Sequence, residues 1–256
     1  MQATSRITFL GHATVALELG GMRVLTDPLL TPRLGLLFRH VANIAQLAEA
    51  ARADIVLISH GHQDHLHLPS LALVPGHPQM VVPVGLGSLL TAHGHRATEI
   101  SAGQTLTFGP LRVRATAARH VVRRDFFGPI TPALGYVISA DGSPRVYFAG
   151  DTDLFPEMAD LAGSVDVALI PVWGWGPRLG TGHLDPARGA EAVRLIRPRL
   201  AIPIHWGTFY PFELERFWPK PLADPPLDFA REVSRIAPDT TVRILAPGDA
   251  MDLPIF

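Results

Sequence analysis

Short apolar runs, bounded by glycine, proline or charged residues, recur along most of the chain. Runs of this length that are rich in valine and isoleucine and separated by turn residues are typical of β-strands. They predict strands at residues 7–10, 14–19, 23–26, 55–58, 111–115, 134–139, 146–149, 167–170 and 200–204. The pair Gly20-Gly21 between the second and third runs is a hairpin signal.

Helical patterns of apolar positions fall between some of these strands. They predict helices at residues 44–52, 155–161, 187–196 and 227–236, and a helix start with an early proline at 69–73. Strands that alternate with helices indicate an α/β domain with mixed sheets. Because no repeat, low-complexity segment or linker interrupts the pattern, we expect residues 1–256 to form a single domain.

Composition narrows the class of protein. Hydrophobic residues make up 47% of the 256 residues, which is enough for a sizeable core. The formal net charge of −1 does not suggest the basic face of a nucleic-acid binder. No apolar stretch reaches the roughly 18 residues that a membrane span needs, and no secretory signal precedes the first strand. We therefore expect a cytoplasmic protein without a transmembrane segment.

The stretch His60-Gly-His62-Gln-Asp64-His65 concentrates four potential metal ligands directly after an apolar run. Groups this crowded are costly for folding unless something holds them together, so the cluster predicts a metal site. His60 and His62 can face one ion, while Asp64 and His65 turn toward a second. The chain contains no cysteine, which excludes thiolate ligands and a cysteine nucleophile.

Three further candidate ligands each follow a predicted strand, namely His120, Asp151 and His205. In α/β proteins, sites gather at the carboxyl ends of strands, so the four segments together predict one site. Each residue alone has a plainer interpretation. In that interpretation, His120 and His205 are ordinary partly buried histidines, and Asp151 is a turn or helix-capping residue.

The order of these motifs resembles the metallo-β-lactamase superfamily over nearly the whole chain. His-x-His-x-Asp-His is followed by a distant histidine, then by Gly-Asp and a last histidine, and Thr26-Asp27-Pro28 resembles the superfamily's first motif. Residues 10–14, 25–29, 58–66 and 204–209 look like the branch that contains L-ascorbate-6-phosphate lactonase and N-acyl-phosphatidylethanolamine phospholipase D.

This resemblance implies a four-layer αββα sandwich with a dinuclear site on one edge. The implied ligands are His60, His62 and His120 for the first ion, Asp64, His65 and His205 for the second, and Asp151 for both. Asp27 would orient a ligand imidazole. Zinc is the expected metal for these ligands, and manganese, iron and nickel remain open. Flavodiiron relatives carry an acidic residue at the position of His62, so this histidine favours hydrolysis over redox chemistry.

Other side chains are candidates for substrate contact. Arg124 is of the type that binds phosphate in a fork geometry, although a solvated surface arginine explains it equally well. Trp173 and Trp206, together with Phe126 and Phe127, predict an aromatic pocket wall, for which core packing is the alternative.

Two residues are candidates for proton transfer. His183 is either an acid or substrate contact near the site, or a loop histidine at the start of a helix. Asp64 is primarily a predicted ligand and can also handle a proton. His12 is expected to be structural or to contact a metal ligand.

The sequence thus predicts a dinuclear metal-dependent hydrolase in which a hydroxide bridging the ions attacks a small-molecule or lipid phosphodiester, or a lactone or ester. The resemblance leaves a homo-oligomer open. One alternative is a nucleic-acid-processing nuclease of the same superfamily, which the near-neutral charge opposes. The other is a non-catalytic metal-binding protein, which the complete ligand set opposes.

Overall fold

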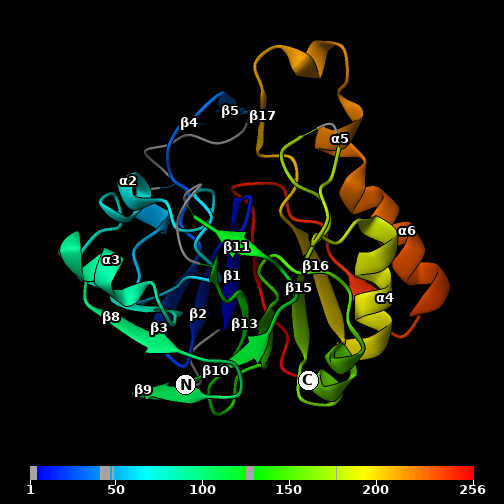
Figure 1. Cartoon of the computed structure of the whole chain (residues 1–256). Helices are drawn as coiled ribbons and strands as arrows, with labels where there is room; N and C mark the ends of the chain where they lie inside the picture. Colours follow the sequence, from blue (N-terminus) through cyan, green and yellow to red (C-terminus); the bar gives the residue numbers. More distant parts are fainter. Residues whose placement is uncertain (1–4, 41–46, 48, 125–129, 177) are drawn as a thin grey trace.

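Two seven-stranded sheets pack face to face and carry helices on their outer faces (Figure 1). The structure is a computed structural model that describes residues 5–40, 47, 49–124, 130–176 and 178–256. The first sheet consists, in spatial order, of β19 (Ala250–Asp252), β1 (Arg6–Gly11), β2 (Thr14–Leu19), β3 (Met22–Thr26), β6 (Ile55–Leu57), β7 (Gln79–Pro83) and β8 (Ala97–Ile100).

The second sheet lies against the first. It consists of β18 (Thr241–Val242), β16 (Leu200–Ile204), β15 (Val167–Pro171), β14 (Val146–Phe148), β13 (Leu134–Ser139), β10 (Leu111–Ala117) and β9 (Thr105–Phe108). Two small sheets complete the β structure. One pairs β11 (Val122–Arg123) with β12 (Ile130–Thr131), and the other contains β17 (Phe209–Pro211), β5 (Leu37–Arg39) and β4 (Arg33–Leu34).

Helices cover both outer faces. The first sheet carries α2 (Leu68–Leu71) and α3 (Gly87–Ala92), and the second carries the 3₁₀-helix η1 (Pro156–Leu161), α4 (Pro186–Ile196) and α6 (Pro225–Ile236). The short helices η2 (Leu214–Arg216) and α5 (Lys220–Ala223) follow β17. Within the described residues, no helix is both long enough and apolar enough to cross a membrane.

Three apolar layers hold the elements together. Phe9, Tyr136 and Phe148 are fully buried between the two sheets. On the other face of the second sheet, Tyr147 packs with helix residues such as Phe229 of α6. Tyr147 and Phe148 thus face opposite layers, as the period of two along a strand requires. A third layer lies between the first sheet and its helices. The four-layer αββα sandwich is therefore confirmed.

The predicted strands are confirmed with boundary shifts of at most two residues. Two of the predicted helices differ in the structure, and a third lies mostly outside the described residues. The segment 155–161 forms a 3₁₀-helix, in which the Met158 N–H donates to the carbonyl of Phe155 three residues earlier. The helix start predicted at 69–73 is the four-residue α2. Most of the helix predicted at 44–52 lies outside the described residues.

Sheet topology explains why the ligand candidates meet. β3, β6 and β7 are parallel, and so are β14, β15 and β16. Parallel strands end at the same edge of a sheet, and Asp27, His60, Asp151 and His205 all follow such ends closely. The two edges lie together, so loops from both sheets contribute to one site.

Candidate metal centre

Three histidines from two different loops form the first ligand group. Nδ1 of His62 lies 3.0 Å from Nε2 of His60 and 3.0 Å from Nε2 of His120. One ring nitrogen of each of the three lies within 4.8 Å of those of the other two. Three imidazole nitrogens that converge in this way are a suitable ligand set for zinc and similar ions.

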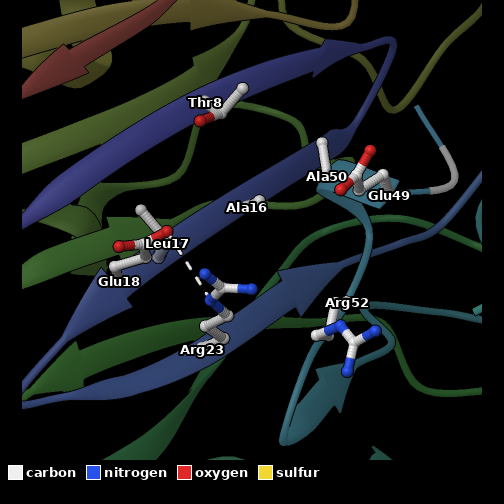
Figure 2. Close-up of a pocket in the computed structure, with 8 residues that line it drawn as sticks. All are labelled: Thr8, Ala16, Leu17, Glu18, Arg23, Glu49, Ala50 and Arg52. Carbon is white, nitrogen blue, oxygen red and sulfur yellow. Dashed lines mark ion pairs between the residues drawn. The ribbon is translucent and has the colours of Figure 1, made fainter. Parts of the chain in front are cut away.

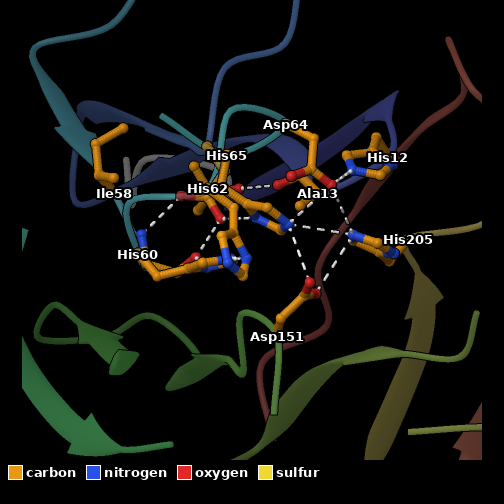
Figure 3. A network of polar contacts seen from close by, with 12 residues as sticks. His12, Ala13, Ile58, His60, His62, Asp64, His65, Asp151 and His205 are labelled. Atoms are coloured by element: carbon orange, nitrogen blue, oxygen red, sulfur yellow. Dashed lines mark hydrogen bonds and ion pairs between the residues drawn. The ribbon is translucent and has the colours of Figure 1, made fainter. Parts of the chain in front are cut away.

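The second group contains Asp64, His65 and His205, joined by His12 (Figure 3). The Nε2 atoms of His65 and His205 are 3.2 Å apart. Asp64 Oδ2 lies 3.5 Å from the Nε2 of His65 and 3.9 Å from that of His205. A mixed set of imidazole and carboxylate groups again fits a divalent cation.

Asp151 lies between the two groups and is only 2% exposed. Its Oδ2 is 3.1 Å from Nε2 of His65, and its Oδ1 is 3.3 Å from Nε2 of His205. It also lies within reach of His120, in a cluster that includes His183. Oδ1 accepts no hydrogen bond from the described residues. A buried carboxylate oxygen without a partner costs free energy, and a cation beside it would remove that cost.

Burial sets the protonation state of most of the histidines. It lowers the pKa of His60, His62 and His120, and it lowers the pKa of His205 to about 3. These imidazoles are therefore neutral at neutral pH, the form that binds metals.

The carboxylates of Asp64 and Asp151 favour a positive charge between them. Burial raises the pKa of Asp64 and of Asp151, but the neighbouring histidines outweigh burial and hold both values well below the usual range. Conversely, burial lowers the pKa of His65, while Asp151 and Asp64 raise it well above the usual value. A cation between Asp64 and Asp151 is thus electrostatically favoured.

Hydrogen bonds on the far side of the ring orient His65 and His120. Nδ1 of His65 lies 2.7 Å from Oδ2 of Asp27, which is fully buried and also accepts hydrogen bonds from Ser59. Nδ1 of His120 donates to the carbonyl of Gly182 at 2.9 Å. These contacts leave the Nε2 atoms directed at the cluster, as outer partners of metal ligands usually do.

The backbone is strained at the same place. Asp27 and His205 have positive φ angles of 34° and 62°, a region that residues other than glycine seldom adopt. Such strain concentrates at functional sites, where the surrounding structure maintains it. Gly150 has a φ of 61°, and a Cβ there would lie 2.6 Å from Cβ of Ser59. The close approach of these two loops therefore requires glycine.

The structure gives the candidate substrate residues other contacts. Nη1 of Arg124 donates to the carbonyls of Gly61 and Leu66, at 2.9 and 2.8 Å, at either end of the histidine loop. The Trp206 ring stacks on Phe9 and packs against the core, which favours packing over substrate contact. Phe126 and Phe127 lie outside the described residues.

Trp173 and His183 are less enclosed. The indole of Trp173 is half-buried and donates to the carbonyl of Gly176 at 3.0 Å, while its own carbonyl accepts a 2.9 Å hydrogen bond from Nδ1 of His205. Nε2 of His183 lies 3.3 Å from Oδ2 of Asp151. Both residues therefore lie beside the cluster.

A cavity of about 400 Å³ lies on the outer face of the first sheet, away from this cluster (Figure 2). The described residues that line it are Thr8, Ala16, Leu17, Glu18, Arg23, Glu49, Ala50 and Arg52. None of these is a histidine, and Glu18 and Arg23 form an exposed ion pair at 3.6 Å. The described lining of the cavity thus offers no imidazole for the predicted metal chemistry.

Known proteins resemble the chain in sequence and in fold. A family model described as a beta-lactamase superfamily domain matches residues 22–206. A UPF0173 metal-dependent hydrolase of Methanopyrus kandleri is 33% identical, over 96% of this chain and 99% of that protein. One from Pelotomaculum thermopropionicum is 32% identical, over 97% of this chain and 100% of that protein.

A solved structure shares the fold. Igni18, a metallo hydrolase from the archaeon Ignicoccus hospitalis, superposes with a TM-score of 0.75 at 24% identity, covering 98% of this chain and 99% of Igni18. The superfamily part of the predicted resemblance is confirmed, and the narrower branch stays a prediction. The chain belongs to the UPF0173 metal-dependent hydrolase family of the beta-lactamase superfamily.

Proposed function

We propose that this protein is a hydrolase that holds two divalent metal ions, with zinc the first choice, at the edge where the ligand groups meet. The proposed substrate is a small molecule or lipid with a phosphodiester, lactone or ester bond. The position of Asp151 between two groups of metal-ligating side chains carries the proposal. Membership of a family of metal-dependent hydrolases supports the reaction class.

Each group has a proposed role in holding the ions. His60, His62 and His120 would hold the first ion, Asp64, His65 and His205 the second, and Asp151 both. Bound divalent ions supply Lewis-acid chemistry and activate water near neutral pH. Asp27 fixes the ring of His65 from behind through the 2.7 Å contact, so that its Nε2 keeps its direction.

His183 is the proposed proton donor. Its side chain is 25% exposed, whereas that of Asp151 beside it is only 2% exposed. Burial lowers the pKa of His183, but the hydrogen bond to Asp151, the negative charge of Asp151 and the carbonyl of Gly180 together outweigh burial and raise the pKa above its ordinary value. Nε2 is then able to hold a proton for the leaving oxygen of a substrate. Asp64 is proposed to accept a proton in addition to its role as a ligand.

The first test is metal content and turnover on one sample. We expect about two ions per chain, loss of hydrolysis with a chelator, and recovery when the metal is restored. Turnover of bis(p-nitrophenyl) phosphate would assign the phosphodiester class, and turnover of simple lactones alone the lactone class. A reconstituted protein that takes up no metal would contradict the proposal, whatever its motifs.

Arg124 provides a test of how the histidine loop is held. Because its guanidinium bonds to the carbonyls of Gly61 and Leu66, Arg124→Ala is expected to lower kcat/KM for phosphodiesters and neutral esters alike, by roughly 10-fold. Arg124→Lys is the control that keeps the charge without the fork geometry. A rise in KM confined to phosphate-bearing substrates would instead support the predicted phosphate contact.

A further inference from the structure

His12 lies on the tight turn between β1 and β2, beside the second ligand group (Figure 3). It is 1% exposed, and its sequence context, Gly-His-Ala-Thr, marks it less clearly than the histidine motif marks the ligands. We propose that His12 is a positioning residue that holds Asp64 and His205 in place for the second ion. This inference rests on the metal centre proposed above.

The side chain of His12 contacts both of these residues. Its Nε2 lies 3.0 Å from Oδ2 of Asp64, within hydrogen-bonding distance, and its ring centroid is 3.9 Å from that of His205. When Nε2–H donates to the carboxylate, the nitrogen has no lone pair left for an ion. His12 then fixes one oxygen of Asp64 and restricts the His205 ring, and it is not itself a ligand.

The backbone of His12 reinforces the same arrangement. Its carbonyl accepts a 2.7 Å hydrogen bond from the N–H of His205, and its own N–H donates to Oγ1 of Thr208 at 2.7 Å. His12 therefore contacts the loop of His205 through its main chain, and it contacts Asp64 through its side chain. These two loops come from different sheets, so His12 couples ligands that the chain supplies far apart.

The turn that carries His12 is held in an unusual conformation. His12 has a φ of 56°, and the preceding Gly11 has a φ of 106°. A Cβ on Gly11 would lie 2.8 Å from Cγ2 of Thr208. Behind the turn, the guanidinium of Arg39 donates to the carbonyl of Leu10 and lies over the ring of Phe209. A left-handed residue other than glycine costs free energy and persists where its surroundings hold it, as they do at many functional sites.

Three substitutions distinguish a positioning role of the His12 ring from the effect of losing its volume. His12→Ala removes the ring, and His12→Asn tolerates the left-handed turn but is too short to reach Asp64. His12→Gln places an amide N–H near the position of Nε2. Metal-free protein would be titrated with zinc against a chromophoric chelator, and its thermal unfolding would be followed in parallel.

We expect the wild type to bind two zinc ions. His12→Ala and His12→Asn should keep one ion at wild-type affinity and bind the other roughly 10- to 100-fold more weakly, and His12→Gln should recover most of the loss. Two ions at wild-type affinity in His12→Ala would overturn the inference. A second pattern would also overturn it: both ions bind equally more weakly, the Tm of the metal-free variants falls, and glutamine does not restore binding. That pattern indicates a merely structural role. A wild type that binds no zinc would instead refute the metal centre itself.

Discussion

Asp151→Asn is expected to lose most of both metal ions and to lower kcat/KM by more than about 100-fold. About 100-fold is the upper range for removing an outer partner of a metal ligand, and Asp151 lies between both ligand groups. Asparagine keeps the size of the side chain but removes the negative charge beside His65 and His205, at 3.1 and 3.3 Å. The measurement is elemental analysis of the purified variant together with its steady-state kinetics.

Asp153→Asn is the matched control for this substitution. Asp153 lies in the same loop but pairs with Arg188, and its side chain is 29% exposed. It is expected to keep both ions and near-normal turnover. An Asp151→Asn protein with two ions and normal rates would remove Asp151 from the proposed centre.

His62→Ala is expected to abolish nearly all activity by a different route. Within the described residues, the hydrogen-bonding distances of His62 are to the first group, 3.0 Å from its Nδ1 to His60 and to His120. Because its ring is half-buried, its removal leaves a smaller cavity than loss of a core side chain would, and the fold should persist. We expect one ion to remain, with a loss of kcat/KM of about 100-fold or more.

Metal stoichiometry distinguishes the two substitutions. One ion in His62→Ala and none in Asp151→Asn would agree with an aspartate shared by two sites. His77→Ala is a suitable control, because His77 is an exposed histidine remote from both ligand groups. Wild-type metal content and rates in His62→Ala would contradict the assignment of the first site.

Local patterns were sufficient for much of the fold. Strand periodicity and turn residues predicted elements such as β2 and β16 to the residue, because buried strands require continuous or alternating apolar side chains. The strand β7 was missed, since Pro83 and the glycines after it interrupt its apolar run. The six residues of η1 were predicted as helical, but their tighter 3₁₀ hydrogen bonding does not follow from apolar spacing.

The sequence by itself determined which side chains are available for metal chemistry, because their types and their place after strands are local properties of the chain. Only the tertiary structure decided which of them meet and what holds them. The contacts of His12 with Asp64 and of His65 with His205 join residues 52 and 140 positions apart. Likewise, Arg124 contacts the histidine loop and Trp206 packs on Phe9, whereas the sequence left substrate contact open beside a surface arginine and core packing. Such contacts depend on how two sheets pack and where their loops converge, and no local pattern along the chain specifies that geometry.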